Sequence, residues 1–301
     1  MQAASLLGSE EFYMLVMPTF YWSLDPALGI RLAVMLILTN GVSSFGKMAF
    51  HLARPYWVDT RIMPLSIETG FGMPSGHAMN AAGLWGLTVA WASQRWVKVV
   101  GVVLIFLIGF SRLYLGMHFI SDVVVGWLVG GLMLYLFLRL EASINAWLRT
   151  RSLQQKIGLA FASSVGIILL ILLGRALAGG WTVPAIWEQN ALRQGDPIAP
   201  FSLDAAFTLA GTWFGMLAGV AWYQQRYGAY SADGTPAQRL LRYALGLVGI
   251  IIFWFGLGQI LPREANLLSY SLRYLRYILV GLWISALAPL LFMRLGLLHK
   301  S

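Results

Sequence analysis

The chain of 301 residues contains no cysteine and very little charge. Without cysteine there are no disulfides, no thiolate nucleophile, and no zinc or iron–sulfur site built on cysteine. Only 11% of the residues are charged, against about 25% in an ordinary soluble domain. Hydrophobic residues make up 58%, and the 13 tryptophans and 12 tyrosines are rings that favour membrane interfaces. This composition excludes a soluble globular protein and a disordered chain, and it predicts an integral membrane protein.

Nine apolar segments are long enough, or nearly so, to cross a bilayer core, which takes about 20 helical residues. The sequence therefore predicts an all-α fold, a polytopic transmembrane helical bundle of about nine helices. The first segment is short and contains Pro18, so it is re-entrant or interfacial if it does not cross, which leaves eight. The segments are 12–24, 27–46, 78–93, 97–114, 119–140, 157–177, 205–223, 240–261 and 272–295.

The distribution of lysine and arginine over the connections predicts the orientation. One side of the membrane collects 12 of the 21 basic residues, and the other side has nine, three of which are assigned below to a site. The positive-inside rule then places the first side in the cytoplasm and the N-terminus outside. The net charge of +9 is attributed mainly to this topology, and without a basic run no nucleic-acid partner is expected. The connection 141–156 is the expected boundary between residues 1–150 and 151–301.

Ionisable residues beside apolar helices are costly and usually functional. Two of the four histidines, His77 and His118, stand at the outer ends of predicted helices. Because the helices alternate in direction, three connections that carry further polar residues emerge on the same outer side. The sequence therefore predicts that these residues gather around the two histidines: Lys47, Arg54, Ser75, Arg112 and Asp122.

The spacing of His118 and Asp122 suggests acid–base chemistry. Residues four apart at the start of a helix share one face. The carboxylate can accept a hydrogen bond from one ring nitrogen, which fixes the tautomer and leaves the other nitrogen as a nucleophile or base. His77, in a different environment, suits a general acid. A purely structural pair of His118 and Asp122 is the alternative.

The segment 74–77, Pro-Ser-Gly-His, precedes an apolar helix and indicates an anion site. Ser75 can cap that helix, Gly76 lets a ligand approach the backbone, and the free N–H groups favour negative charge. Arginine forks and a lysine suit the oxygens of a phosphoryl group. Taken singly, each cation has another explanation, such as reaching the membrane interface or capping a helix. The three cations are Lys47, Arg54 and Arg112.

Taken together, these motifs resemble the three-part signature of the type 2 phosphatidic acid phosphatase (PAP2) superfamily, which includes glucose-6-phosphatase, bacterial acid phosphatases and vanadium haloperoxidases. The resemblance covers residues 12–141 and implies a six-helix catalytic core, with the later helices outside the signature. Nine helices with the N-terminus outside are similar to the topology of glucose-6-phosphatase. The matching residues are Lys47-x6-Arg54-Pro55, Pro74-Ser75-Gly76-His77 and Ser111-Arg112-x5-His118-x3-Asp122.

The resemblance implies a two-step phosphoryl transfer that needs no metal and no cofactor. His118 would attack phosphorus and form a phosphohistidine, while Asp122 orients it. His77 would protonate the leaving group and later deprotonate the attacking water. The phosphoryl oxygens would be bound by Lys47, Arg54, Ser75, the amide of Gly76 and Arg112.

A pocket that opens near the outer membrane surface predicts a lipid phosphate as substrate and membrane lipids as partners. The candidates are phosphatidate, phosphatidylglycerol phosphate, undecaprenyl diphosphate and a sphingoid phosphate, and the segment 68–72 resembles a lead-in found in several lipid phosphatases. A soluble sugar phosphate is the alternative. A transporter, which would spread its charges through several helices, is a remote one. A bacterial inner or cell membrane is expected, with the active site on the extracytoplasmic side.

The outer connection 178–204 carries Trp181, Trp187 and Arg193. It either covers the pocket and selects the head group, or forms an interface loop with an aromatic belt.

Overall fold

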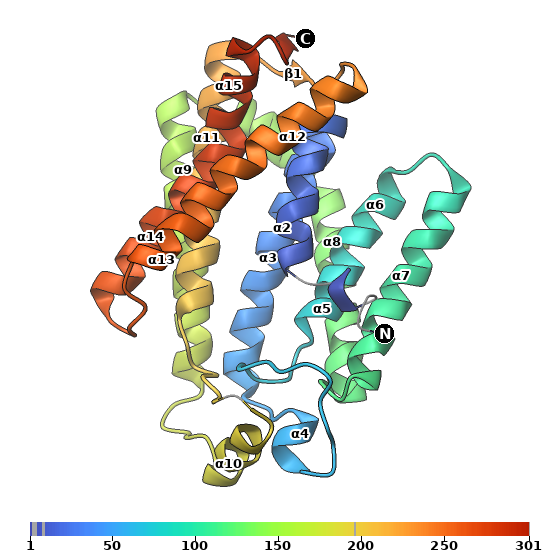
Figure 1. Cartoon of the computed structure of the whole chain (residues 1–301), viewed down its shortest axis with the longest axis vertical. Coiled ribbons are helices and arrows are strands. Elements are labelled where there is room, and N and C mark those ends of the chain that lie inside the picture. The colour runs from blue at the N-terminus through green and yellow to red at the C-terminus, as the bar shows by residue number, and fades with distance from the viewer. Residues whose placement is uncertain (2–4, 8–9, 196, 301) are drawn as a thin grey trace. The chain divides into compact units, whose positions relative to one another are not determined.

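The computed structural model describes residues 1, 5–7, 10–195 and 197–300 (Figure 1). Helices dominate it, and two short strands, β1 (Tyr230–Ser231) and β2 (His299–Lys300), pair antiparallel. Four π-helical stretches lie within or between the α-helices: η1 (Phe20–Leu24), η2 (Ala81–Trp85), η3 (Ile251–Gly256) and η4 (Trp283–Leu287). The α-helices are α2 (Glu10–Thr19), α3 (Pro26–Phe50), α4 (Pro55–Val58), α5 (Gly76–Asn80), α6 (Gly86–Trp91), α7 (Arg95–Tyr114), α8 (Ile120–Arg149), α9 (Leu153–Leu177), α10 (Ala185–Arg193), α11 (Asp204–Tyr227), α12 (Pro236–Ile250), α13 (Leu257–Ile260), α14 (Leu267–Leu282) and α15 (Ala288–Arg294).

Seven helical segments of the described residues are long and apolar enough to cross a membrane, and each overlaps one predicted segment. The prediction of a polytopic, all-α membrane protein is thus confirmed. The other two predicted segments are helical but shorter: α2, with Pro18 inside it, runs into η1, and the run α5–η2–α6 has 5, 5 and 6 residues. The seven segments are Pro26–Val58, Arg95–Tyr114, Ile120–Arg149, Leu153–Leu177, Asp204–Tyr227, Pro236–Ile260 and Leu267–Arg294.

The chain forms two compact units that interleave in sequence. The first unit comprises Met1–Tyr13, Met35–Glu141 and Leu170–Ser202. The second comprises Met14–Val34, Ala142–Leu169 and Leu203–Ser301. All of the site residues predicted above belong to the first unit.

Two glycines of α8 bring this helix against α5 in the first unit. A Cβ atom on Gly126 would lie 2.8 Å from the carbonyl oxygen of Ser75, and one on Gly130 would lie 2.6 Å from that of Met79. Only glycine allows backbones to approach so closely, and a glycine every fourth residue is a common device of membrane helices. One turn before Gly126, the carbonyl oxygen of Asp122 accepts a hydrogen bond of 3.0 Å from the Ser75 amide. The packing of α8 on α5 thereby joins two of the predicted motifs.

A buried aromatic cluster holds the connection after α3 against the connection after α9. Trp57 and Phe71 are fully buried, and Trp181 and Trp187 pack against them. The side chain of Asn190 donates a hydrogen bond of 2.9 Å to the carbonyl oxygen of Trp57, and α10 contacts α4 (Figure 1). Burying such large rings stabilises the two connections as one surface, which frames the region of the predicted site.

Close helix packing also organises the second unit. A Cβ on Gly211 would lie 2.5 Å from the carbonyl oxygen of Tyr274, and one on Gly215 would collide with that of Ile278. Both positions place α11 directly on the backbone of α14. The core of this unit also contains the fully buried rings of Trp22 and Phe292.

Candidate active site

Each predicted site residue lies at the end of a helix or just outside one. Lys47 is in the last turn of α3, and Arg112 is in the last turn of α7. Arg54 and Ser75 are the residues that precede α4 and α5, and Asp122 is in the first turn of α8. The polar side chains of the site thus lie at the ends of the apolar helices, and the middle of each helix stays free of their charge.

The ring of His118 lies between a carboxylate and a guanidinium. Its Nδ1 atom is 3.4 Å from Asp122 Oδ2, and its Nε2 atom is 3.2 Å from Nη1 of Arg54. Because a guanidinium can only donate, Nε2 is the acceptor and the proton belongs on Nδ1, facing the carboxylate. The same Oδ2 accepts a hydrogen bond of 2.9 Å from the Phe119 amide, which fixes its position. This tautomer places the unprotonated lone pair, which nucleophilic attack requires, on Nε2, where Arg54 now donates to it.

Arg54 is fully buried and is held in place by carbonyl groups. It donates to the carbonyl oxygens of Gly70 at 2.6 Å, Met117 at 3.1 Å and Phe71 at 3.1 Å. A buried arginine with this many fixed acceptors keeps its guanidinium in one orientation.

Glu68 is a site residue that was not assigned a role from the sequence. Its Oε2 atom accepts a hydrogen bond of 2.6 Å from Arg54 Nη2, and its Oε1 atom accepts one of 2.5 Å from Arg112 Nη2. Oε1 also lies 3.9 Å from Nδ1 of His77. Capping a helix was the other explanation for a cation such as Arg112, and in the structure Arg112 pairs with Glu68. The sequence offers one signal, because buried arginines such as Arg54 and Arg112 require a carboxylate and Glu68 is the acidic residue nearest the Pro-Ser-Gly-His segment.

The start of α5 offers a polar backbone next to this cluster. The Ser75 hydroxyl accepts a hydrogen bond of 3.5 Å from the Ala78 amide and so caps the helix. A Cβ atom on Gly76 would come within 3.3 Å of Ser43 Oγ and 3.9 Å of Lys47 Nζ. The lysine ammonium therefore lies beside the Gly76 backbone, and a side chain at Gly76 would crowd the Ser43 hydroxyl.

The charges of the cluster shift its titratable groups. Burial, followed by the positive charge of Arg54, holds the pKa of His118 well below 6.5. Burial and the neighbouring Arg112 lower the pKa of His77 to about 3. Burial would raise the pKa of Glu68, but Arg54, Lys47 and Arg112 outweigh burial and hold it well below 4.5. Both histidines are thus neutral at pH 7 and Glu68 is ionised.

The aromatic connection described above borders the cluster. The Thr69 carbonyl oxygen, next to Glu68, accepts a hydrogen bond of 3.1 Å from the Ala199 amide. Trp181 contacts Phe71 and also the ring of His51, whose centroid is 4.5 Å away. His51 therefore has a packing role here, while Arg193 is exposed.

Two parts of the chain match known protein families. Residues 28–145 match the PAP2 superfamily, and residues 207–300 match the transmembrane extension of PAP2 superfamily phosphatases. The first match contains every predicted site residue. No solved structure matches the chain.

Curated relatives differ in how much of the chain they cover. Sphingosine-1-phosphate phosphatase 1 of Rattus norvegicus is 31% identical over 150 residues, which are 48% of this chain and 35% of that protein. Undecaprenyl-diphosphatase of Sulfolobus acidocaldarius is 26% identical over 38% of this chain and 56% of its own length. Glucose-6-phosphatase 3 of Rattus norvegicus is 24% identical over 94% of this chain and 86% of its own.

The chain thus spans about a third of the length of the sphingosine-1-phosphate phosphatase that it matches. The predicted site residues lie in the first matched region. Of the seven segments of the described residues that are long and apolar enough to cross a membrane, four precede the second matched region. On these matches, the chain is a polytopic membrane protein of the PAP2 superfamily.

Proposed function

We propose that this protein is a phosphatase that hydrolyses the phosphomonoester or diphosphate of a lipid through a phosphohistidine intermediate. The observation that carries the proposal is the arrangement around His118, where Asp122 faces Nδ1 and Arg54 faces Nε2. This arrangement supplies a neutral nucleophile directly beside a cation that can bind a phosphoryl oxygen. The names of the relatives, which include two kinds of lipid phosphatase, support the same class of substrate.

In the first step, Nε2 of His118 attacks phosphorus, a P–N bond forms, and the bond from phosphorus to the leaving oxygen breaks. Asp122 stabilises the positive charge that develops on the ring. His77 gives its proton to the leaving oxygen. The phosphoryl oxygens are bound by Lys47, Arg54, Ser75, the Gly76 amide and Arg112.

In the second step, His77 takes a proton from water, the water oxygen attacks phosphorus, and the P–N bond to His118 breaks. His77 is neutral without substrate, because its pKa is about 3. A phosphate dianion between the arginines raises that pKa, so substrate binding itself prepares the general acid.

Phosphate release from a substrate panel tests the proposal. The full-length protein in detergent is given short-chain phosphatidate, phosphatidylglycerol phosphate, a sphingoid-base phosphate, an isoprenyl diphosphate and glucose 6-phosphate. His118→Ala should lower turnover by at least about 10³-fold. Arg226→Gln, at an exposed position of α11, is the control and should behave as the wild type. A His118→Ala variant that keeps most of the activity would refute the nucleophile.

Hydrolysis of a soluble sugar phosphate is the second candidate function. It is favoured by glucose-6-phosphatase 3, whose similarity extends over 94% of this chain. Faster hydrolysis of glucose 6-phosphate than of every lipid in the panel would select it.

We further propose that residues 1–150 form the catalytic core, that residues 151–301 add helices to it, and that the site faces the extracytoplasmic side of a bacterial inner or cell membrane. The lack of native cysteine makes the orientation simple to test. Met63, which is 78% exposed in the connection before Glu68, is replaced by cysteine. Labelling of intact cells by an impermeant maleimide supports this orientation, and labelling only after lysis contradicts it.

A further inference from the structure

The carboxylate of Glu68 binds two of the side chains, Arg54 and Arg112, that the proposed function assigns to the substrate phosphate. Its two carboxylate oxygens each accept a hydrogen bond from a different buried arginine, Arg54 and Arg112. The geometry of two N–H donors meeting two oxygens of one anion is the geometry that a phosphoryl group would use. The site therefore already contains an anion, and that anion belongs to the chain.

We infer that Glu68 is an internal anion that competes with the substrate for Arg54 and Arg112, so that a phosphate binds by displacing its carboxylate. The inference rests on the proposed function for its substrate, and its test below uses binding alone.

The structure allows the side chain of Glu68 to leave while its backbone stays in place. The Tyr56 hydroxyl donates a hydrogen bond of 2.8 Å to the Glu68 carbonyl oxygen and accepts one of 3.2 Å from the Glu68 amide. The side chain is 26% exposed, whereas those of Arg54 and Arg112 are 0% and 2% exposed. The carboxylate thus reaches the arginines from the solvent side, and a rotation about its own bonds returns it to water.

Charge counting explains why the discrimination should depend on the number of negative charges. The cluster contains three cations, Lys47, Arg54 and Arg112. The carboxylates of Glu68 and Asp122 leave it with a net charge of +1, and withdrawal of Glu68 raises this to +2. A phosphomonoester dianion neutralises that charge, whereas a monoanion only restores the net charge of +1 of the resting cluster, so the exchange of Glu68 for a monoanion gains nothing in charge.

Binding of two anions to the full-length protein in detergent tests this inference without any turnover. Isothermal titration at about pH 8 compares inorganic phosphate, mostly a dianion there, with dimethyl phosphate, a monoanion. The wild type should bind phosphate and discriminate against dimethyl phosphate. Glu68→Gln, which keeps the shape and removes the competing charge, should bind both anions about tenfold more tightly, because the free energy of displacing the carboxylate is the same for both.

Two further variants make each outcome decisive. Glu68→Asp retains the charge and should bind both anions as the wild type does, even if Glu68→Gln is less stable. Asp59→Asn is the matched control, because Asp59 lies in the same connection and pairs with the exposed Arg61; it should change neither affinity. Phosphate binding by Glu68→Gln that is equal to or weaker than that of the wild type would overturn the inference. Activity that persists in His118→Ala would instead refute the proposed function and leave this binding result standing.

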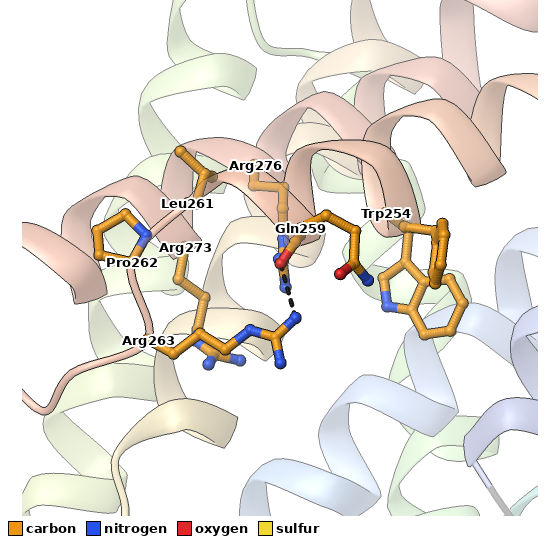
Figure 2. A pocket seen from close by; sticks show the side chains of 9 residues that line it. Trp254, Gln259, Leu261, Pro262, Arg263, Arg273 and Arg276 are labelled. Carbon is orange, nitrogen blue, oxygen red and sulfur yellow. Dashed lines mark hydrogen bonds between the residues drawn. The ribbon is translucent and has the colours of Figure 1, made fainter.

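A second cluster of arginines surrounds a hollow of about 290 Å³ in the second unit (Figure 2). Arg263, Arg273 and Arg276 point toward it from the connection after α13 and from α14. Arg273 is paired with Asp204 at 3.1 Å, whereas the described residues include no carboxylate paired with the other two. The hollow therefore has excess positive charge.

The local backbone is arranged to keep these guanidinium groups in position. Arg263 donates a hydrogen bond of 2.9 Å to the carbonyl oxygen of Gly258, and a Cβ atom on Gly258 would lie only 2.7 Å from Nη1 of Arg276. The Nε atom of Arg276 is buried without a hydrogen-bond partner. A buried, unpaired donor of a charged group indicates an acceptor that binds there.

We propose that this hollow binds the phosphate group of an anionic membrane lipid. The choice of a lipid follows from the apolar residues near it in the chain: Phe255, which lines the hollow, is 55% exposed, and Ile260 and Leu267 on the two adjoining helices are 80% and 78% exposed. Arginines beside exposed aliphatic side chains suit a head group with its acyl chains alongside.

Thermal unfolding of the full-length protein in detergent tests this second site. Short-chain phosphatidylglycerol should raise the unfolding temperature of the wild type by several degrees. Phosphatidylcholine and free glycerol phosphate should do so by much less. The double variant Arg263→Gln/Arg276→Gln should lose the shift, and Arg226→Gln should keep it. An equal shift in the double variant, or an equal effect of glycerol phosphate, would overturn the lipid site.

Discussion

The two arginine clusters of this protein contain the same side chain in opposite surroundings. Arg54 and Arg112 are almost fully buried, share the carboxylate of Glu68 and lie beside His77 and His118. The arginines around the second hollow are partly exposed, and no histidine is among the residues that line it. The difference shows that arginine provides anion affinity in both places, while only the first cluster has the acid–base groups that a reaction requires.

The largest expected effect comes from removing the carboxylate that orients His118. Asp122→Asn should lower turnover by about 10²–10⁴-fold, because an amide can stabilise the wrong tautomer of the ring. Steady-state rates of phosphate release measure it. Asp233→Asn, at a carboxylate that is 91% exposed, is the matched control and should have no effect. An Asp122→Asn variant with normal turnover would remove the main distinction between the two clusters.

A neighbouring pair of glycines tests whether helix contact builds the first cluster. Gly130→Ala should lower the free energy of unfolding by about 1–3 kcal/mol, because its Cβ would lie 2.6 Å from the Met79 carbonyl oxygen. Gly131→Ala, with no atom within 4 Å of its Cβ, should change stability by less than about 0.5 kcal/mol. Denaturation monitored by tryptophan fluorescence compares the two. Equal effects would show that α8 does not depend on this contact.

The stability of the folded protein against acid should depend on the protonation of His77 in the first cluster. His77 has a pKa of about 3 in the folded protein and 6.5 as its ordinary value, so between these values the unfolded chain binds the extra proton. Stability is then complete above pH 6.5 and falls as the pH is lowered toward 3. Thermal unfolding across this range should be less pH-dependent in His77→Gln than in the wild type. An identical slope in both proteins would contradict the neutral, buried state of His77.

The smallest effect is expected at the aromatic connection next to the first cluster. Trp187→Ala removes a ring that packs on Trp57, at a centroid distance of 6.2 Å. If this connection selects the head group, the ratio of rates for two lipid phosphates should change by about 2–10-fold, while the preferred substrate is still hydrolysed. Substrate competition assays measure the ratio. An unchanged ratio would leave the connection with a purely structural role.

The sequence was informative about the site because membrane burial makes polar residues expensive. Lys47, Arg112 and His118 stand at the ends of long apolar segments, and the structure places all of them at helix ends. Glu68 does not stand at the end of an apolar segment. It lies in a connection whose path depends on the hydrogen bonds of Tyr56 and Arg54. The sequence marked the first segment as short through Pro18, but it gave no such sign for the segment 78–93, which the structure divides into α5, η2 and α6.

The order and residue types of the motifs, the all-α membrane fold and seven of its membrane-spanning segments were determined by the sequence itself, since apolar length and the scarcity of charge leave no other structure for a bilayer. The tertiary structure decided which charges meet. The glycine contacts of α8 with α5 set the distance between motifs, and the connection after α4 brought Glu68 onto Arg54 and Arg112. Such pairings depend on close contacts between segments that are distant in sequence, and no local pattern encodes them.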